Sequence, residues 1–318
     1  MSRLRNKDLS SRQWFRLILA SFWRSEDPLE NPFGKSMTYI CMIESPRIIL
    51  RLAVFFLLAL SLCASAAGQS LRPVTIPGSE VRTLRSTATG RDYDLYIHAP
   101  HLEPGRKYPV LYVLDGQWDF KLLDSVYGGL LYDKFVPEMF IVGITYSGAN
   151  PNYDSLRAMD LTPVAVPLRP GSGDAPKFLS FLEQQLLPYI EQTYPADPSR
   201  RILMGSSLGG LFTLYTMFTE PALFSAYVSA SPAVTYGAPF AFKQEADFAA
   251  HHHELPTRLF LSVGAIEELA GPVQDYAKIL RSRSYQGLKL ETRVIEGERH
   301  SGVKPESFNR GLRFVFQN

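Results

Sequence analysis

Apolar residues between positions 91 and 297 gather into short runs separated by polar or helical stretches. The run at 91–99 alternates polar and apolar residues, which is typical of a strand with one exposed face. The runs at 108–116 and 139–146 are apolar throughout, as expected for strands covered on both faces. Further strands are predicted at residues 201–205, 224–231, 258–264 and 288–297.

Between these runs, apolar residues recur at the three- and four-residue spacing of a helix that buries one face. One such stripe covers 178–190, and Pro188 inside it predicts a kink or an early end. Other stripes at 211–218 and 276–280 predict two more helices, and a last helix is expected near 307–316.

The alternation of strands with helices predicts an α/β fold, with a mostly parallel central sheet and helices on both faces. Ligands of such sheets bind at the carboxyl ends of the strands. Residues that directly follow a predicted strand are therefore the candidates for chemistry. Because no repeat or low-complexity linker follows residue 70, we expect residues 67–318 to form a single domain.

The first 66 residues have a different pattern. Arg47 and Arg51 precede an apolar run at 52–62, and the small residues at 64–66 follow it. Basic residues, an apolar run and then small residues are the layout of a secretory signal peptide. The apolar run is also shorter than the roughly 20 residues of a membrane span. A retained N-terminal anchor is the alternative.

We therefore predict a signal peptide at residues 42–66, since Met42 gives a leader of ordinary length. Residues 1–41 are then an over-extended or non-native N-terminus. The mature protein is expected to be secreted or periplasmic, with no membrane attachment after cleavage.

Composition and charge exclude some classes of partner. The 318-residue chain is 46% hydrophobic and 20% charged, which is ordinary for a globular protein. Residues 1–66 hold nine of the 33 Lys and Arg and five of the 31 Asp and Glu, which leaves 24 basic and 26 acidic residues. The mature part thus shows no basic excess for nucleic acid. Both cysteines, Cys41 and Cys63, precede residue 67, so the predicted domain contains no disulfide.

The sequence G-x-S-x-G at residues 205–209 lies between a predicted buried strand and a predicted helix. A sharp strand–Ser–helix turn needs small neighbours, because its serine takes strained backbone angles. The amino end of the helix also offers unpaired N–H groups that suit a developing oxyanion. Ser207 is therefore the candidate nucleophile, and a plain serine in a small-residue turn is the alternative.

A serine hydroxyl needs a base to act as a nucleophile. His300 follows the last predicted strand, and its place after the serine agrees with the chain order Ser, acid, His of α/β-hydrolases. His98 and His101 precede the serine motif, and the histidines at 251–253 have the pattern of a solvated loop. His300 is therefore the candidate base, with an exposed loop histidine as the alternative.

Two carboxylates, Glu267 and Glu268, follow the strand predicted at 258–264. Either could orient His300 and stabilise its imidazolium, and the other would then be surface charge at a helix start. The segment LDGQW ends an early buried strand, so the Gln117 N–H is a candidate oxyanion donor together with the Leu208 N–H. An ordinary Asp-Gly turn is the alternative for LDGQW.

Several segments together resemble the enterochelin-esterase-like esterase family, a branch of the α/β-hydrolases. The segments are YPVLYVLDGQWDF, MDLTP, LLPYIEQTYPADPSRRILMGSSLGGLFTLY, SPAV and ERHSGV, and the resemblance spans residues 76–316. It implies Ser207 as the nucleophile and His300 as the base. It also implies that the acid stands three residues after Gly264, which selects Glu267.

The same resemblance implies oxyanion donors at Gln117 and Leu208, and ester chemistry without a metal or other cofactor. The family includes hydrolases of siderophore lactones and of acylated sugars, so the implied substrate is a small-molecule ester. Trp118 and Arg157 are candidate substrate-binding residues, and a structural ion pair of Arg157 with Asp160 is the alternative. No dense Arg and Lys cluster lies near the motifs.

An acyltransferase with the same triad and a retired hydrolase fold that only binds a ligand are the competing functions.

Overall fold

A computed structural model describes residues 50, 51, 53–57 and 73–317. Contacts divide the chain into the units Met1–Pro73 and Val74–Asn318. In the first unit, the described residues before Pro73 are helical and exposed. Within the described ranges, no helix is both long and apolar enough to cross a membrane.

The predictions for the N-terminal region fall mainly outside the described residues. This holds for the over-extended N-terminus at 1–41 and for most of the signal peptide at 42–66, including its cleavage site at 64–66. Both remain predictions.

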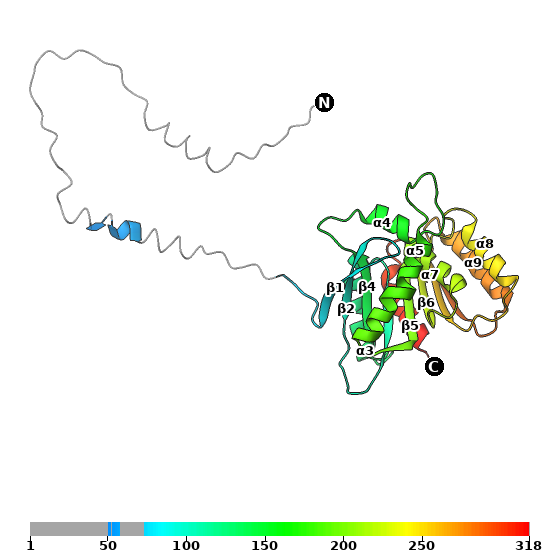
Figure 1. Cartoon of the computed structure of the whole chain (residues 1–318), viewed down its shortest axis with the longest axis horizontal. Coiled ribbons are helices and arrows are strands. Elements are labelled where there is room, and N and C mark those ends of the chain that lie inside the picture. Colours follow the sequence, from blue (N-terminus) through cyan, green and yellow to red (C-terminus); the bar gives the residue numbers. More distant parts are fainter. Residues whose placement is uncertain (1–49, 52, 58–72, 318) are drawn as a thin grey trace, which may run out of the picture. The chain divides into compact units, whose positions relative to one another are not determined.

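A sheet of eight strands forms the centre of the unit Val74–Asn318 (Figure 1). The strands are β1 (Ser79–Arg85), β2 (Asp92–His98), β3 (Tyr108–Val113), β4 (Phe140–Tyr146), β5 (Ala196–Ser206), β6 (Ala226–Ala230), β7 (Arg258–Gly264) and β8 (Lys289–Ile295). Their order is β1-β2-β4-β3-β5-β6-β7-β8. The pairs β1–β2 and β2–β4 are antiparallel, and all other neighbours are parallel. The predicted mostly parallel sheet is therefore confirmed.

Helices cover both faces of this sheet. They are α3 (Gly116–Tyr132), α4 (Tyr153–Asp160), α5 (Ala175–Phe181), the π-helical turn η1 (Leu182–Leu186), α6 (Leu187–Thr193), α7 (Leu208–Thr219), α8 (Phe240–Ala249), α9 (Ala270–Arg283) and α10 (Lys304–Phe316). Helices α3 and α10 pack on one face, and α5 to α9 with η1 pack on the other.

Strand β3 shows why both faces need apolar residues. Val110 and Tyr112 belong to the core beneath α5 to α9, whereas Leu111 and Val113 belong to the core beneath α3 and α10. Successive side chains of a strand point to opposite faces, so a strand between two helical layers is apolar at every position.

Some elements differ from the sequence predictions. Strand β1 was not predicted, because it lies at the edge of the sheet and six of its seven residues are exposed, which leaves no apolar run. Helix α3 was also not predicted, although its buried residues do recur at helical spacing: Phe120, Leu123, Tyr127 and Leu130. Helices α4 and α8 likewise lie outside the predicted set.

Pro188 does not end the helix in which it stands. The chain widens into the π-turn η1 just before it, and the Leu187 N–H donates to the carbonyl of Leu182, five residues back. Helix α6 then continues to Thr193 with Pro188 in its first turn. In a regular α-helix the proline ring would clash with the carbonyl four residues back, and the wider π-turn relieves that clash.

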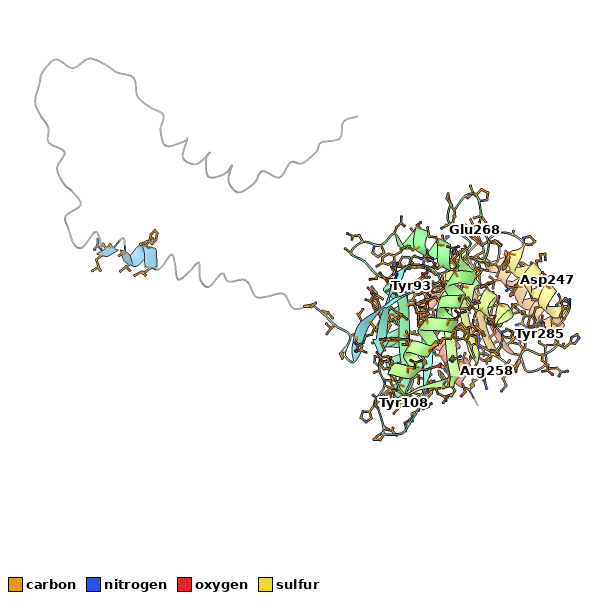
Figure 2. The ribbon with its side chains drawn as sticks, viewed as in Figure 1. Tyr93, Tyr108, Asp247, Arg258, Glu268 and Tyr285 are labelled. Atoms are coloured by element: carbon orange, nitrogen blue, oxygen red, sulfur yellow. The ribbon has the colours of Figure 1, made fainter. Side chains whose placement is uncertain are left out.

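The parallel strands all run toward one end of the sheet. Figure 2 shows Tyr108 and Arg258, the first residues of β3 and β7, at one end of the molecule and Glu268, which follows β7, at the other. Helix α4 lies at the Glu268 end in Figure 1. This carboxyl edge is where the fold is expected to bind a ligand.

Two glycines of α3 provide a test of the packing. A Cβ at Gly116 would lie 2.8 Å from the carbonyl carbon of Gly143 in β4, whereas a Cβ at Gly128 would meet nothing within 4 Å. We expect Gly128→Ala to raise the free energy of unfolding by about 0.5–1 kcal/mol, since alanine loses less backbone entropy in a helix. Gly116→Ala should lower it by about 1–3 kcal/mol through overpacking. Urea unfolding followed by circular dichroism measures both, and equal stabilities would contradict the close contact.

Candidate active site

Ser207 stands alone between β5 and α7 in a strained conformation. Its φ is 61° and its ψ is −118°, a region that non-glycine residues rarely occupy. Small neighbours make the sharp turn possible, because a Cβ at Gly205 would lie 2.5 Å from the backbone of Gly209. A Cβ at Gly210 would lie 3.0 Å from the carbonyl oxygen of Ala230. The structure thus places Ser207 on the kind of turn that exposes a serine hydroxyl in hydrolases.

Backbone hydrogen bonds hold this turn from two sides. The Ser207 N–H donates to the carbonyl of Ala230 at 3.0 Å. The Ser207 carbonyl accepts from the N–H groups of Leu211 at 2.9 Å and Ala233 at 3.0 Å. The segment 230–233, which begins with the last residue of β6, therefore fixes the serine in place.

Glu267 and His300 are in direct contact. His300 Nδ1 lies 2.6 Å from Glu267 Oε2, and the Glu267 side chain is only 4% exposed against 42% for His300. The other carboxylate oxygen, Oε1, accepts from Ser231 Oγ at 2.5 Å and from the Gly264 N–H at 2.6 Å. When Nδ1 carries the proton that it donates to Glu267, the opposite nitrogen Nε2 is left as an acceptor.

Ser231 connects the Glu267–His300 pair to the turn that carries Ser207. Its hydroxyl binds Glu267, and its neighbours in the segment 230–233 bind the backbone of Ser207. The sequence analysis assigned no role to Ser231, because it placed this residue inside the strand predicted at 224–231, whereas β6 ends at Ala230. Among the described residues, no hydrogen bond joins the side chains of Ser207 and His300. Such contacts are often long before a substrate binds.

Glu268 has a different environment from Glu267. It is exposed, whereas the Glu267 side chain is nearly buried, although both residues line a cavity of about 360 Å³ at the carboxyl edge together with His300. Figure 2 shows Glu268 at the surface of this end of the molecule. The carboxylate in contact with His300 is that of Glu267.

The two predicted oxyanion donors begin neighbouring helices. Gln117 is the second residue of α3 and Leu208 is the first residue of α7, and these helices follow the adjacent parallel strands β3 and β5. A Cβ at Gly209 would lie 3.4 Å from Leu114 Cβ, so the two helix starts are close together. The first N–H groups of a helix have no partner within the helix, which leaves them available to an anion.

Arg157 and Trp118 lie beside these helix starts. The Arg157 guanidinium binds both oxygens of Asp115, with Nε at 2.9 Å from Oδ1 and an Nη at 2.7 Å from Oδ2. It also lies 5.5 Å from the centre of the Trp118 ring, which is 41% exposed. The alternative pairing of Arg157 with Asp160 is wrong, because Asp160 has other partners.

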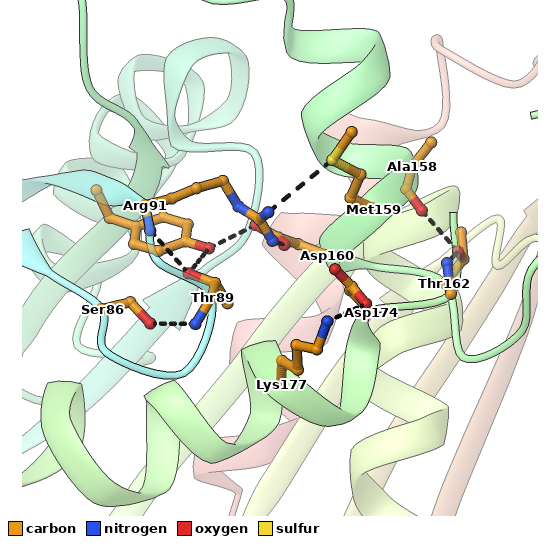
Figure 3. Close-up of polar contacts among 11 residues, drawn as sticks. Ser86, Thr89, Arg91, Ala158, Met159, Asp160, Thr162, Asp174 and Lys177 are labelled. Atoms are coloured by element: carbon orange, nitrogen blue, oxygen red, sulfur yellow. Dashed lines mark hydrogen bonds and ion pairs between the residues drawn. The ribbon is translucent and has the colours of Figure 1, made fainter. Parts of the chain in front are cut away.

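Those partners tie α4 to the start of β2, as Figure 3 shows. Asp160 is fully buried and binds Arg91, and its second oxygen accepts from the Tyr93 hydroxyl at 2.6 Å. Burial raises the pKa of Asp160 to about 6, although Tyr93 and Arg91 favour the carboxylate. Because α4 also carries Arg157, this cluster anchors the helix from which Arg157 reaches Asp115.

Within the described part of the chain, no group of three or more His, Cys, Asp or Glu side chains is arranged to hold a metal ion. The described groups at the carboxyl edge can perform nucleophilic and acid–base chemistry. A strained serine, a histidine held by a carboxylate and two helix amino ends lie at one edge of the sheet. These are the components of acyl transfer through a serine.

The strand order and the serine turn define an α/β-hydrolase fold. Residues 86–301 match the family model described as "Putative esterase". The chain belongs to this esterase family, and it is a carboxylic ester hydrolase.

Relatives cover most of the chain. It is 34% identical to the ferri-bacillibactin esterase BesA of Bacillus subtilis, over 78% of this chain and 93% of that protein. It is 27% identical to the siderophore triacetylfusarinine C esterase of Aspergillus fumigatus, over 79% of this chain and 97% of the relative. The crystal structure of the BES protein from Bacillus cereus superposes with a TM-score of 0.72 and 27% identity, over 79% of this chain and 100% of that one.

The buried cluster around Asp160 predicts a pH effect on stability. Because the pKa of Asp160 is higher in the folded protein than in the unfolded chain, the folded state keeps a proton that the unfolded state has released between about pH 4 and 6. The free energy of unfolding therefore falls as pH rises through this window. Asp160→Asn should remove that contribution, which amounts to up to about 3 kcal/mol at roughly 1.4 kcal/mol per pKa unit.

Urea unfolding of the wild type and of Asp160→Asn at pH 4, 5, 6 and 7 measures this effect. Asp154→Asn changes an exposed carboxyl of the same helix and is the control. The difference between wild type and Asp160→Asn should change with pH, while the difference for Asp154→Asn stays nearly constant. Parallel curves for all three proteins would contradict the raised pKa.

Proposed function

We propose that this protein hydrolyses siderophore esters through a covalent acyl-enzyme on Ser207, with His300 as the base and Glu267 as the acid that orients it. The contact of 2.6 Å between Glu267 and His300 carries the proposal, because it lies at the same edge of the sheet as the strained serine. The names of relatives support the substrate class, since the two relatives described above are a ferri-bacillibactin esterase and a siderophore triacetylfusarinine C esterase.

In the proposed mechanism, His300 Nε2 accepts the proton of the Ser207 hydroxyl as its oxygen attacks the ester carbonyl. Glu267 keeps the ring in the required tautomer and stabilises the imidazolium that forms. The imidazolium then gives the proton to the leaving alkoxide, and an acyl-enzyme remains. Water, activated by the same histidine, attacks this ester and releases the acid.

The backbone N–H groups of Leu208 and Gln117 are proposed to bind the oxyanion. Both belong to first helical turns, so the positive ends of two helix dipoles point toward the negative charge that develops. Donors that are already oriented need no rearrangement in the transition state, which is why such groups contribute strongly to the rate.

Arg157 and Trp118 are proposed to contact the substrate. The exposed Trp118 ring offers a flat apolar surface, and the adjacent guanidinium lies over it. Asp115 already neutralises much of the Arg157 charge. We therefore expect Arg157 to select shape and hydrogen bonding more than net negative charge.

The nucleophile and the base are tested together. Ser207→Ala and His300→Ala should each reduce kcat by about 10³-fold or more, and the double variant should be little worse than either single variant, because the two residues act as a unit. Hydrolysis of an aryl ester and of an iron-loaded catecholate trilactone measures kcat. Labelling with a fluorophosphonate tests the covalent step directly. An active Ser207→Ala protein, or a wild type that resists the label, would refute the mechanism.

Glu267 and Glu268 form a matched pair of tests. Glu267→Gln should lower kcat steeply, by up to about 10⁴-fold, because the amide misorients His300 and cannot stabilise its imidazolium. Glu268→Gln removes the same charge one residue away and should leave kcat within about twofold, because surface substitutions rarely matter. Steady-state kinetics on one aryl ester compares them, and a crippled Glu268→Gln enzyme would reverse the assignment.

A further inference from the structure

A buried ion pair joins the first turns of α3 and α10. Lys304 Nζ lies 2.7 Å from Asp119 Oδ1, although the two residues are 185 positions apart in the chain. The Asp119 side chain is 2% exposed and that of Lys304 is 22% exposed. The proposed mechanism uses neither residue.

Each partner stands next to a proposed catalytic group. Asp119 lies two residues after Gln117 in the first turn of α3. Lys304 begins α10, four residues after His300. The ion pair therefore links the helix that carries an oxyanion donor to the helix that follows the base.

The backbone between His300 and Lys304 is short and tightly folded. The Arg299 carbonyl accepts from the N–H groups of Gly302 and Val303 at 3.1 and 3.3 Å. Val303 is fully buried in the core beneath α3 and α10. A shift of the start of α10 would therefore be passed to His300, whose one side-chain hydrogen bond within the described chain is to Glu267.

The pair is poorly suited to stabilising the fold. Within the described residues, Asp119 Oδ2 has no hydrogen-bond partner, and burial raises the pKa of this carboxyl despite the nearby Lys304 ammonium. The desolvation of such charges offsets most of their attraction, so an apolar pair of similar size would hold the helices as well. The apolar core that α3 and α10 share already includes Phe120, Leu123 and Phe308.

We infer that Asp119 and Lys304 are positioning residues, which keep the turn bearing His300 in register with the first turn of α3. Apolar burial is non-directional, whereas a short ion pair between the two first turns requires one specific geometry. Misplacement of a reacting group by about 1 Å can cost about 10²-fold in rate. This inference rests on the proposed function.

Four variants test the positioning role. Lys304→Met removes the charge and keeps the length of the side chain, and Lys304→Arg keeps the charge. The double variant Asp119→Leu/Lys304→Met replaces the pair by apolar groups. Arg310→Met is the control, because it breaks an exposed ion pair of the same helix, in which Arg310 Nε lies 2.6 Å from Glu306 Oε1.

Kinetics on an aryl ester, the rate of labelling by a small fluorophosphonate and the midpoint of thermal unfolding are measured for each protein. We expect Lys304→Met and the double variant to lower kcat and the labelling rate by about 10–100-fold, with KM within twofold of the wild type. Lys304→Arg should recover most of the loss, and Arg310→Met should match the wild type. The double variant should unfold at or above the wild-type midpoint, which separates positioning from folding.

If the wild type is active and Lys304→Met has the same kcat, the positioning role is overturned and the proposed function stays intact. A rise in KM at constant kcat also overturns it, because that result means substrate contact. A kcat loss in Lys304→Met that the double variant reverses overturns it too, since the loss then came from the unpaired Asp119. A wild type that neither hydrolyses an ester nor reacts with the phosphonate overturns the proposed function itself.

Discussion

Ser207 holds φ and ψ angles of 61° and −118°, a conformation that costs a non-glycine residue about 1–3 kcal/mol. The surrounding structure maintains it with three backbone hydrogen bonds and with glycines where two chain segments touch. The same segment that anchors the serine, residues 230–233, also supplies the Ser231 hydroxyl that binds Glu267. A single short segment at the end of β6 therefore connects the strained serine with the carboxylate that holds His300.

Around this centre, buried carboxylates tie together elements that begin or end at the carboxyl edge of the sheet. Asp115 binds Arg157 of α4, Asp119 binds Lys304 of α10, and Asp160 anchors α4 to Arg91 and Tyr93. Buried ion pairs contribute little net stability, but they require specific geometry. This edge of the molecule is therefore held by directional contacts, while the two faces of the sheet are held by apolar packing.

The main features of the fold could be predicted from the sequence because burial on both faces produces apolar runs. The predicted strands at 108–116, 139–146 and 258–264 correspond to β3, β4 and β7 with ends that differ by at most three residues. Strand β1 could not be predicted in this way, since an edge strand without a buried face has no such run. The π-turn before Pro188 was equally hidden, because the sequence predicted only a kink or an early end there and the choice depends on local backbone geometry.

For the site, the sequence by itself determined which residues follow strands, and so it determined Ser207, His300 and the pair Glu267 and Glu268 as candidates. Which residues follow a strand is a local property of the sequence. A parallel sheet then brings the ends of all its strands to one edge. Only the tertiary structure decided which side chains meet there. It brought Glu267 to His300, gave Arg157 to Asp115 rather than Asp160, and joined Asp119 to Lys304 across 185 residues. Such pairings depend on strand register and helix packing, which no stretch of sequence carries alone.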